Sequence, residues 1–285
     1  MFRSIRHGVP LCATVLTLCV ATTGWGKWQE TTTSPQQTAL LTTVAQLVQE
    51  TPHPVAVFDL DSTLYKNYGR WVVILHEFGA MKNIPALRRI TATQISDSFD
   101  HLGVLHHDAG LDRALAERLL PEFKTFWTTR FFSNPYLRYD EALPGAVAFV
   151  KVLYKAGAHI VYITGRDEKN MRAGTVAKLK KDGFPINGSR TLLLMKPTVN
   201  ATIGEKSAAL RQTDLDWKQK AIAHVKSLGT VVASFENEPD YINLYHDAFH
   251  KEGTGTAVFL DTDMYPRETP VPLRHGVVTI SGFLQ

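Results

Sequence analysis

Five short apolar runs, separated by segments of helix length, are the feature that most restricts the fold of this chain. Runs of this kind, without polar alternation, are typical of strands buried on both faces of a parallel sheet. The predicted strands lie at 54–61, 159–164, 191–195, 230–235 and 257–260. Because parallel neighbours need a crossover connection, the sequence predicts an α/β fold with a doubly wound parallel sheet covered by helices on both faces.

Capping residues indicate where the helices between these strands begin and end. Ser34 followed by Pro35 predicts a helix that starts ahead of the first strand. Gly157 and Gly183 predict two helix ends, because glycine adopts the left-handed conformation that commonly closes a helix. Asp216 is expected to cap the helix before the fourth strand. The other expected elements are helices at 143–155, 168–181, 216–228 and 239–250 and a candidate edge strand at 277–280.

Residues 65–138 interrupt this alternation. Apolar residues recur there at helical spacing, and no segment reads as a strand. We therefore expect an all-helical insertion at 65–138 within a core formed by 27–64 and 139–285. The aromatic residues at 123–132 are interpreted as packing of this insertion. Its histidines, His101, His106 and His107, show no His-x₃-His spacing and no carboxylate partner at the spacing of a metal site.

The first 26 residues have the layout of a secretory signal peptide. Two arginines precede a short apolar run, and small residues follow it. The run is shorter than a membrane span of about 20 residues, so cleavage is favoured over an uncleaved anchor, and a lipid anchor at Cys19 is less favoured still. We expect a periplasmic or secreted protein with no stable membrane insertion after cleavage.

The two cysteines of the chain, Cys12 and Cys19, both lie in this predicted signal peptide. The mature protein would then contain none, which excludes disulfides, thiolate metal sites and a cysteine nucleophile. The formal net charge is +4, and no dense Lys/Arg run with interleaved aromatics is present. Nucleic acid is therefore not an expected partner.

Polar side chains follow three of the predicted strands. Asp59 and Asp61 end the first run, Thr164 and Gly165 follow the second, and Glu236 follows the fourth. Since the carboxyl ends of parallel strands meet at one edge of the sheet, these residues are expected to lie close together. The sequence thus predicts a single polar site at that edge.

This set of residue types suits phosphoryl transfer, which needs a nucleophile, a proton donor for the leaving oxygen and cations around the phosphoryl group. Asp59 can attack phosphorus and form an aspartyl-phosphate. Asp61 can protonate the leaving group and later deprotonate water. The Thr164 hydroxyl and the backbone N–H groups that follow can bind a phosphoryl oxygen. Acidic oxygens of Asp59 and of Glu236 or Asp240 are hard ligands for Mg²⁺.

The same residues resemble the motifs of the haloacid dehalogenase (HAD) superfamily. Residues 58–64 are similar to its motif I, Asp-x-Asp-x-Thr, and 161–166 look like motif II, with Thr164 as the hydroxyl residue. The resemblance implies that Asp59 is the nucleophile and Asp61 the acid/base. It also implies an HAD-like Rossmannoid core, in which the strands lie in the order fifth, fourth, first, second, third, and a helical cap of the C1 position.

Motifs III and IV are also present, the latter with a departure. Residues 217–220 resemble motif III, with Lys218 as first choice for the phosphate-binding lysine and Lys220 as the alternative. Residues 234–240 are similar to motif IV, but Glu236 stands where many members have aspartate. The resemblance implies Mg²⁺ held by acids at the two motifs, and Glu236 and Asp240 both stay open as its motif IV ligand. The implied metal-binding residues are Asp59, Asp61, Glu236 and Asp240.

The predicted function is hydrolysis of small-molecule phosphomonoesters through an aspartyl-phosphate, for phosphate scavenging outside the cytoplasm. The alternatives are a phosphotransferase and an HAD-fold binding protein with reduced catalysis.

Several side chains near the predicted site have interpretations of their own. Thr164 could cap a helix, Glu238 is interpreted as a helix-capping or surface acid, Arg166 could contact a substrate or form a salt bridge, and Arg70 could bind a substrate anion.

Overall fold

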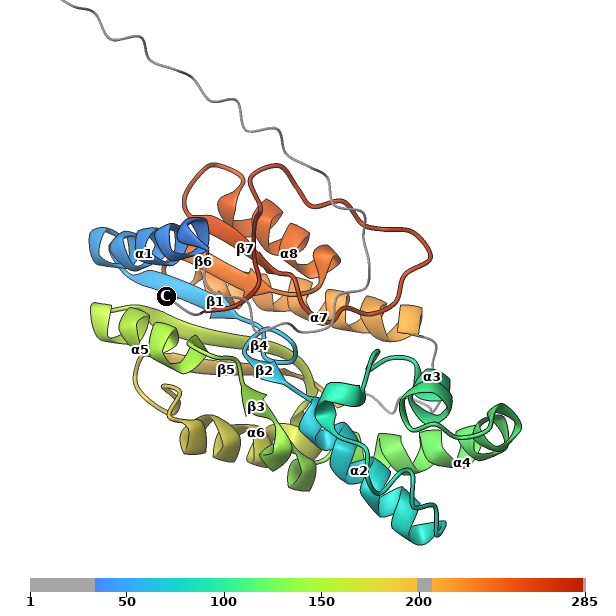
Figure 1. The fold of residues 1–285 in the computed structure, drawn as a ribbon. Coiled ribbons are helices and arrows are strands. Elements are labelled where there is room, and N and C mark those ends of the chain that lie inside the picture. Colours follow the sequence, from blue (N-terminus) through green and yellow to red (C-terminus); the bar gives the residue numbers. More distant parts are fainter. Residues whose placement is uncertain (1–33, 199–206, 284–285) are drawn as a thin grey trace, which may run out of the picture.

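A computed structural model describes residues 34–198 and 207–283. The predicted signal peptide, residues 1–26, lies outside the described residues. A six-stranded parallel sheet forms the centre of the molecule, in the order β5-β4-β1-β6-β7-β8 (Figure 1). Its strands are β1 Pro54–Phe58, β4 His159–Asp167, β5 Thr191–Lys196, β6 Thr230–Glu236, β7 Thr256–Leu260 and β8 Val278–Ile280.

This order confirms the predicted sheet, including the edge strand at its end. β1 lies in the middle and pairs in parallel with β4 on one side and β6 on the other. All five residues of β1 are buried. Because the chain extends the sheet in opposite directions from β1, the carboxyl end of β1 is the position where a doubly wound sheet binds its ligand.

Helices cover both faces, and alternate residues of β1 point to each layer. On one face, Ala56 and Phe58 join a hydrophobic cluster with residues of α1, α5 and α6. On the other face, Val55 and Val57 join residues of α7 and α8. The two-residue period of a strand therefore accounts for the continuous apolar run. The helices are α1 Pro35–Glu50, α5 Ala146–Ala156, α6 Glu168–Asp182, α7 Ser207–Lys226 and α8 Pro239–Tyr245.

Three of the four predicted caps are confirmed. The Ser34 side chain accepts a hydrogen bond from the backbone N–H of Gln37 at 3.1 Å. Gly157 and Gly183 end α5 and α6 with φ angles of 115° and 89°. The cap at Asp216 is wrong, because α7 extends through it. There Asp216 accepts a hydrogen bond from Gln212 at 2.8 Å, one helical turn earlier. An exposed aspartate with such a partner is tolerated within a helix.

The predicted helix at 239–250 is continuous but changes its geometry. α8 ends at Tyr245, and one π-helical turn, η4 His246–His250, completes the segment. Within the part of the chain that the structure describes, no helix combines the length and the apolar character that a bilayer crossing requires.

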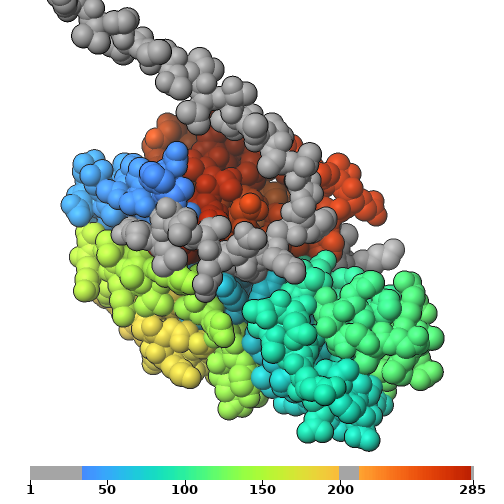
Figure 2. Space-filling model, in the orientation of Figure 1, coloured from blue at the N-terminus to red at the C-terminus, as the bar shows by residue number. Residues whose placement is uncertain are grey.

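Much of the predicted insertion forms a lobe beside the sheet (Figures 1 and 2), with a hydrophobic core built from residues 68–131, whereas Tyr65 and Leu137 pack in the core of the sheet. We call this lobe the insertion. Its elements are α2 Tyr68–Met81, η1 Ala92–Gln94, α3 His101–Gly103, η2 Val104–Asp108, α4 Arg113–Phe131 and η3 Asn134–Tyr139. The prediction of helices without strands is wrong at one edge. Two short strands, β2 Tyr65–Lys66 and β3 Glu141–Ala142, pair antiparallel at the base of the insertion. Two residues are too few to show the alternation that marks a strand.

A close backbone contact holds the two connecting segments of the insertion together. A Cβ atom at Gly69 would lie 1.9 Å from the backbone oxygen of Tyr139, so no larger residue fits there without a shift of the backbone. We expect Gly69→Ala to lower the free energy of unfolding by about 1–3 kcal/mol, the usual cost of overpacking. Urea denaturation at fixed pH measures this difference.

Gly282→Ala is the matched control, because a Cβ atom at Gly282 meets nothing within 4 Å. Its denaturation midpoint should equal that of the wild type. Equal midpoints for Gly69→Ala and the wild type would contradict the close contact.

Candidate active site

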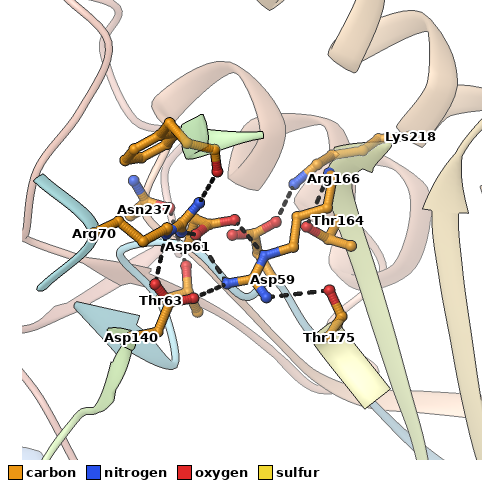
Figure 3. Close-up of polar contacts among 11 residues, drawn as sticks. Asp59, Asp61, Thr63, Arg70, Asp140, Thr164, Arg166, Thr175, Lys218 and Asn237 are labelled. Carbon is orange, nitrogen blue, oxygen red and sulfur yellow. Dashed lines mark hydrogen bonds and ion pairs between the residues drawn. The ribbon is translucent and has the colours of Figure 1, made fainter. Parts of the chain in front are cut away.

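Asp59 lies directly after β1 and is held there by the neighbouring strand. Its backbone N–H donates to the carbonyl oxygen of Phe235 on β6 at 3.0 Å. Its side chain is nearly buried, and Oδ1 accepts a hydrogen bond from Lys218 Nζ at 2.8 Å. The polar contacts of this region are drawn in Figure 3.

Lys218 is the lysine that reaches Asp59, whereas Lys220 is exposed. The ammonium group of Lys218 also donates to Glu236 Oε2 at 2.5 Å and lies 4.6 Å from the ring centre of Tyr241. Burial alone would lower the pKa of Lys218, but Asp59 and Glu236 outweigh burial and raise it well above its usual value. Lys218 is therefore a fixed positive charge within α7, and not at the start of that helix as predicted.

The structure separates the two motif IV acids that the sequence left open. Glu236 is fully buried at the end of β6, and its Oε1 accepts backbone N–H groups of Asn237 and Glu238, both at 3.1 Å. Asp240 instead pairs with Arg267 at 3.0 Å. Glu236 thus shares Lys218 with Asp59, and Asp240 belongs to a different ion pair.

Glu238 occupies the N-cap position of α8, but it is neither exposed nor bonded to the helix by its side chain. Its carboxylate accepts hydrogen bonds from Arg267 and from the backbone N–H of Tyr265, the latter at 2.7 Å. It therefore anchors the segment after β7 beside the site.

Burial raises the pKa of both acids that contact Lys218. The pKa of Asp59 rises to about 6, with Lys218 opposing the effect of burial. The pKa of Glu236 rises to about 8, through burial and then through the negative charge of Asp59, again opposed by Lys218. One lysine thus compensates two buried carboxylates incompletely, and a further cation would be stabilised beside them.

These donors are compatible with Mg²⁺, since Asp59 and Glu236 offer hard carboxylate oxygens in a region with too little positive charge. The full set predicted from the sequence is not assembled. Across residues 34–198 and 207–283, no three His, Cys, Asp or Glu side chains converge as a metal site requires. Asp240 is engaged by Arg267, and Asp61 by arginines.

Asp61 forms ion pairs with two arginines. Arg166 donates to its two carboxylate oxygens at 2.7 and 2.9 Å, and Arg70 donates to Oδ1. Burial acts to raise the pKa of Asp61, but the two guanidinium groups outweigh it and hold that pKa far below its usual range. Both arginines also bind Asp140, which no sequence motif pointed to.

Thr164 and Gly165 lie at the same edge of the sheet, next to α7. Thr164 is buried within β4, which continues to Asp167, and Asp167 rather than Thr164 caps α6. The Thr164 hydroxyl accepts the backbone N–H of Arg166 at 3.2 Å. A Cβ atom at Gly165 would lie 2.8 Å from Asp214 Oδ2, so glycine permits this close approach.

The aromatic residues of the insertion pack against one another, as predicted. The rings of Trp71 and Trp127 lie 4.9 Å apart, and Trp71 and Phe123 lie 6.1 Å apart. His101 is part of this packing, at 4.9 Å from Trp71 and 4.5 Å from Trp127. His106 interacts through Nδ1 with the carbonyl oxygen of Leu111 at 2.8 Å.

Comparison with known proteins supports the resemblance seen in the motifs. Residues 119–227 match the family described as "HAD superfamily, subfamily IIIB (Acid phosphatase)". This segment contains Thr164 and Lys218, whereas Asp59, Asp61 and Glu236 lie outside it. The match covers less than half of the chain, and it agrees with the positions of motifs II and III and so supports an HAD-type phosphatase.

Distantly similar solved structures include a predicted phosphoglycolate phosphatase from Haemophilus somnus 129PT, with 15% identity, 80% of this chain and 94% of that chain covered, and a TM-score of 0.42. An HAD family hydrolase from Salmonella enterica serovar Typhi has 16% identity, coverage of 88% and 78%, and a TM-score of 0.40. A hydrolase from Pseudomonas syringae has 18% identity, coverage of 73% and 84%, and a TM-score of 0.31. A comparison with curated proteins finds no match.

The raised pKa of Glu236 predicts a pH dependence of stability. The unfolded chain releases this proton near pH 4.5 and the folded chain near pH 8, so the folded state binds it more tightly between these values. The contribution of Glu236 to stability is therefore present below pH 4.5 and is lost as the pH rises towards 8. One proton can contribute at most about 1.4 kcal/mol per pH unit.

We expect the free energy of unfolding of Glu236→Gln, relative to the wild type, to increase from pH 5 to pH 8 in EDTA. Urea denaturation at each pH measures this difference. Glu117→Gln on α4 is an exposed control that should show a constant difference. A constant difference for Glu236→Gln as well would contradict the raised pKa.

Proposed function

We propose that this protein is an exported, Mg²⁺-dependent phosphomonoester hydrolase of the HAD type that forms an aspartyl-phosphate on Asp59. The observation that carries the proposal is the contact of Asp59 with Lys218 at the carboxyl end of β1, two residues before Asp61. A nucleophile and a fixed cation at a topological switch point are what phosphoryl transfer requires.

The side chains have separate roles in this reaction. Lys218 holds Asp59 Oδ1, and we assign the attack on phosphorus to Oδ2, which accepts no hydrogen bond from the described residues. Asp61 takes up a proton from solvent, gives it to the leaving oxygen, and then removes a proton from the water that attacks the aspartyl-phosphate and carries the phosphoryl group away. Its side chain is 31% exposed, which allows this access. Thr164 and Gly165 bind phosphoryl oxygens beside Lys218.

Asp59 and Glu236 would hold the magnesium ion, which when bound neutralises charge on the phosphoryl oxygens. The raised pKa values of these two acids support this assignment, because burial, their main cause, disfavours the charged carboxylates and a bound cation would stabilise them. Asp240 stays in its ion pair with Arg267 in this proposal.

The sequence also supports a proposed location and substrate. The signal-like residues 1–26 support export to the periplasm or the medium, and an exported phosphatase there would release phosphate from organic monoesters. A second candidate is an HAD-fold binding protein with reduced catalysis. The ion pairs of Asp61 with Arg70 and Arg166 favour this second candidate, because they oppose protonation of Asp61, which the hydrolase needs as its acid.

Hydrolysis of para-nitrophenyl phosphate tests these proposals. We expect the mature wild type to hydrolyse it with Mg²⁺ and to lose this activity in EDTA, with recovery when Mg²⁺ is restored. Asp59→Asn should lower kcat at least about 10³-fold, because it removes the nucleophile. The measurement is release of para-nitrophenol at saturating substrate.

Asp216→Asn, which changes an exposed acid on α7, is the matched control and should keep wild-type kcat. Absence of turnover with every divalent metal tried, alongside tight phosphate binding, would favour the binding protein. Transfer of phosphate to an added alcohol in preference to water would identify a phosphotransferase.

A further inference from the structure

Four charged side chains form a closed ring of ion pairs beside the proposed nucleophile (Figure 3). Arg70 donates to Asp61 and, through Nε, to Asp140 Oδ1 at 2.5 Å. Arg166 donates to Asp61 Oδ2 at 2.7 Å and to Asp140 Oδ2 at 2.8 Å. Each arginine therefore bridges the same two aspartates.

Only one member of the ring is accessible. The side chains of Arg70 and Arg166 are each 1% exposed and that of Asp140 is 0% exposed, whereas that of Asp61 is 31% exposed. A substrate can therefore touch Asp61 and not the three side chains behind it. Two cations and two anions balance, as groups at this depth require.

The ring joins the insertion to the core. Asp61 follows β1 and Arg166 lies within β4, whereas Arg70 lies in the first turn of α2 and Asp140 follows η3. Arg70 and Asp140 thus belong to the two segments that connect the insertion. The β2–β3 pair and the contact of Gly69 with Tyr139 hold these segments side by side.

The insertion also orients Arg70. Its Nη1 donates to the backbone oxygen of Phe131 at 3.1 Å, and its guanidinium group lies 4.1 Å from the centre of the Phe131 ring. Phe131 in turn stacks on Trp127 at 4.2 Å. The direction in which Arg70 presents its N–H groups is therefore set by the packing of α4.

We propose that Arg70 and Asp140 are positioning residues for the phosphatase reaction. With Arg166 they fix the direction in which Asp61 points, by engaging both of its carboxylate oxygens. Proton transfer depends on such alignment more steeply than binding does. The inference rests on the proposed function, in which Asp61 transfers the proton to the leaving group.

Substrates that differ only in the need for this proton provide the test. Phenyl phosphate has a poor leaving group, and 2,4-dinitrophenyl phosphate has one that departs without protonation. We expect Arg70→Lys, which keeps the charge but loses the planar fork, to lower kcat about tenfold for phenyl phosphate and less than about threefold for the dinitrophenyl ester. KM should stay within about twofold, because Arg70 does not touch substrate.

Asp140→Asn is the second variant and should show the same selective loss, so the test survives if Arg70→Lys does not fold. Arg130→Lys, in a partly exposed pair with Glu77, is the matched control and should leave kcat unchanged for both esters. Urea denaturation of each variant establishes that it is folded at the assay temperature.

A double-mutant cycle decides whether Arg70 acts through Asp61. In an Asp61→Asn background, which should itself lose activity selectively on phenyl phosphate, Arg70→Lys should cause no further selective loss. If the double variant instead showed the product of the two single selective losses, the proposal would be overturned. An equal loss on both esters in folded variants, or a rise in KM with unchanged kcat, would also overturn it. If instead the wild type is inactive, or Asp61→Asn loses both activities equally, the proposed function fails and the positioning role fails with it.

Discussion

The ion pairs of Lys218 with Asp59 and Glu236 connect the three elements on which the site depends. Asp59 follows β1, Glu236 ends β6 and Lys218 projects from α7, so one ammonium group fixes two strand ends and a helix. All three side chains are nearly buried. Loss of the lysine would leave two uncompensated carboxylates, a cost of about 3–5 kcal/mol for a broken buried pair. The contact that prepares the nucleophile is therefore also a structural one.

Parallel strands explain why the site could be located from the sequence. Each of the predicted strands is present, and strand ends of a parallel sheet share one edge. Asp59 and Glu236 therefore both reach Lys218, and Thr164 lies beside them at the end of β4. The motif position made Lys218 the first choice over Lys220, and Lys218 is the lysine that reaches Asp59 because of the rotation of α7. The predicted start of that helix was wrong. Aspartate is a common helix cap, but Asp216 lies on an exposed face inside α7.

The ring around Asp61 had the weakest sequence signal. The sequence suggests a substrate anion for Arg70 and either a substrate contact or a salt bridge for Arg166, and the structure places both in salt bridges. Asp140 was missed, because it lies at the return of the insertion and follows no strand of the main sheet. A buried acid at such a position is recognisable only when the two connecting segments are seen side by side. Local sequence patterns predict helices and strands well, whereas contacts between segments that lie far apart in the sequence can be recognised only once the fold is known.

The central claim is that Asp59 carries the phosphoryl group during turnover. Acid quenching of the enzyme during hydrolysis, followed by proteolysis and mass spectrometry, measures this directly. We predict that the peptide containing Asp59 gains the mass of one phosphoryl group, and that the corresponding Asp59→Asn peptide does not. Steady turnover with this peptide unmodified, and a phosphoryl group on another residue, would contradict the account.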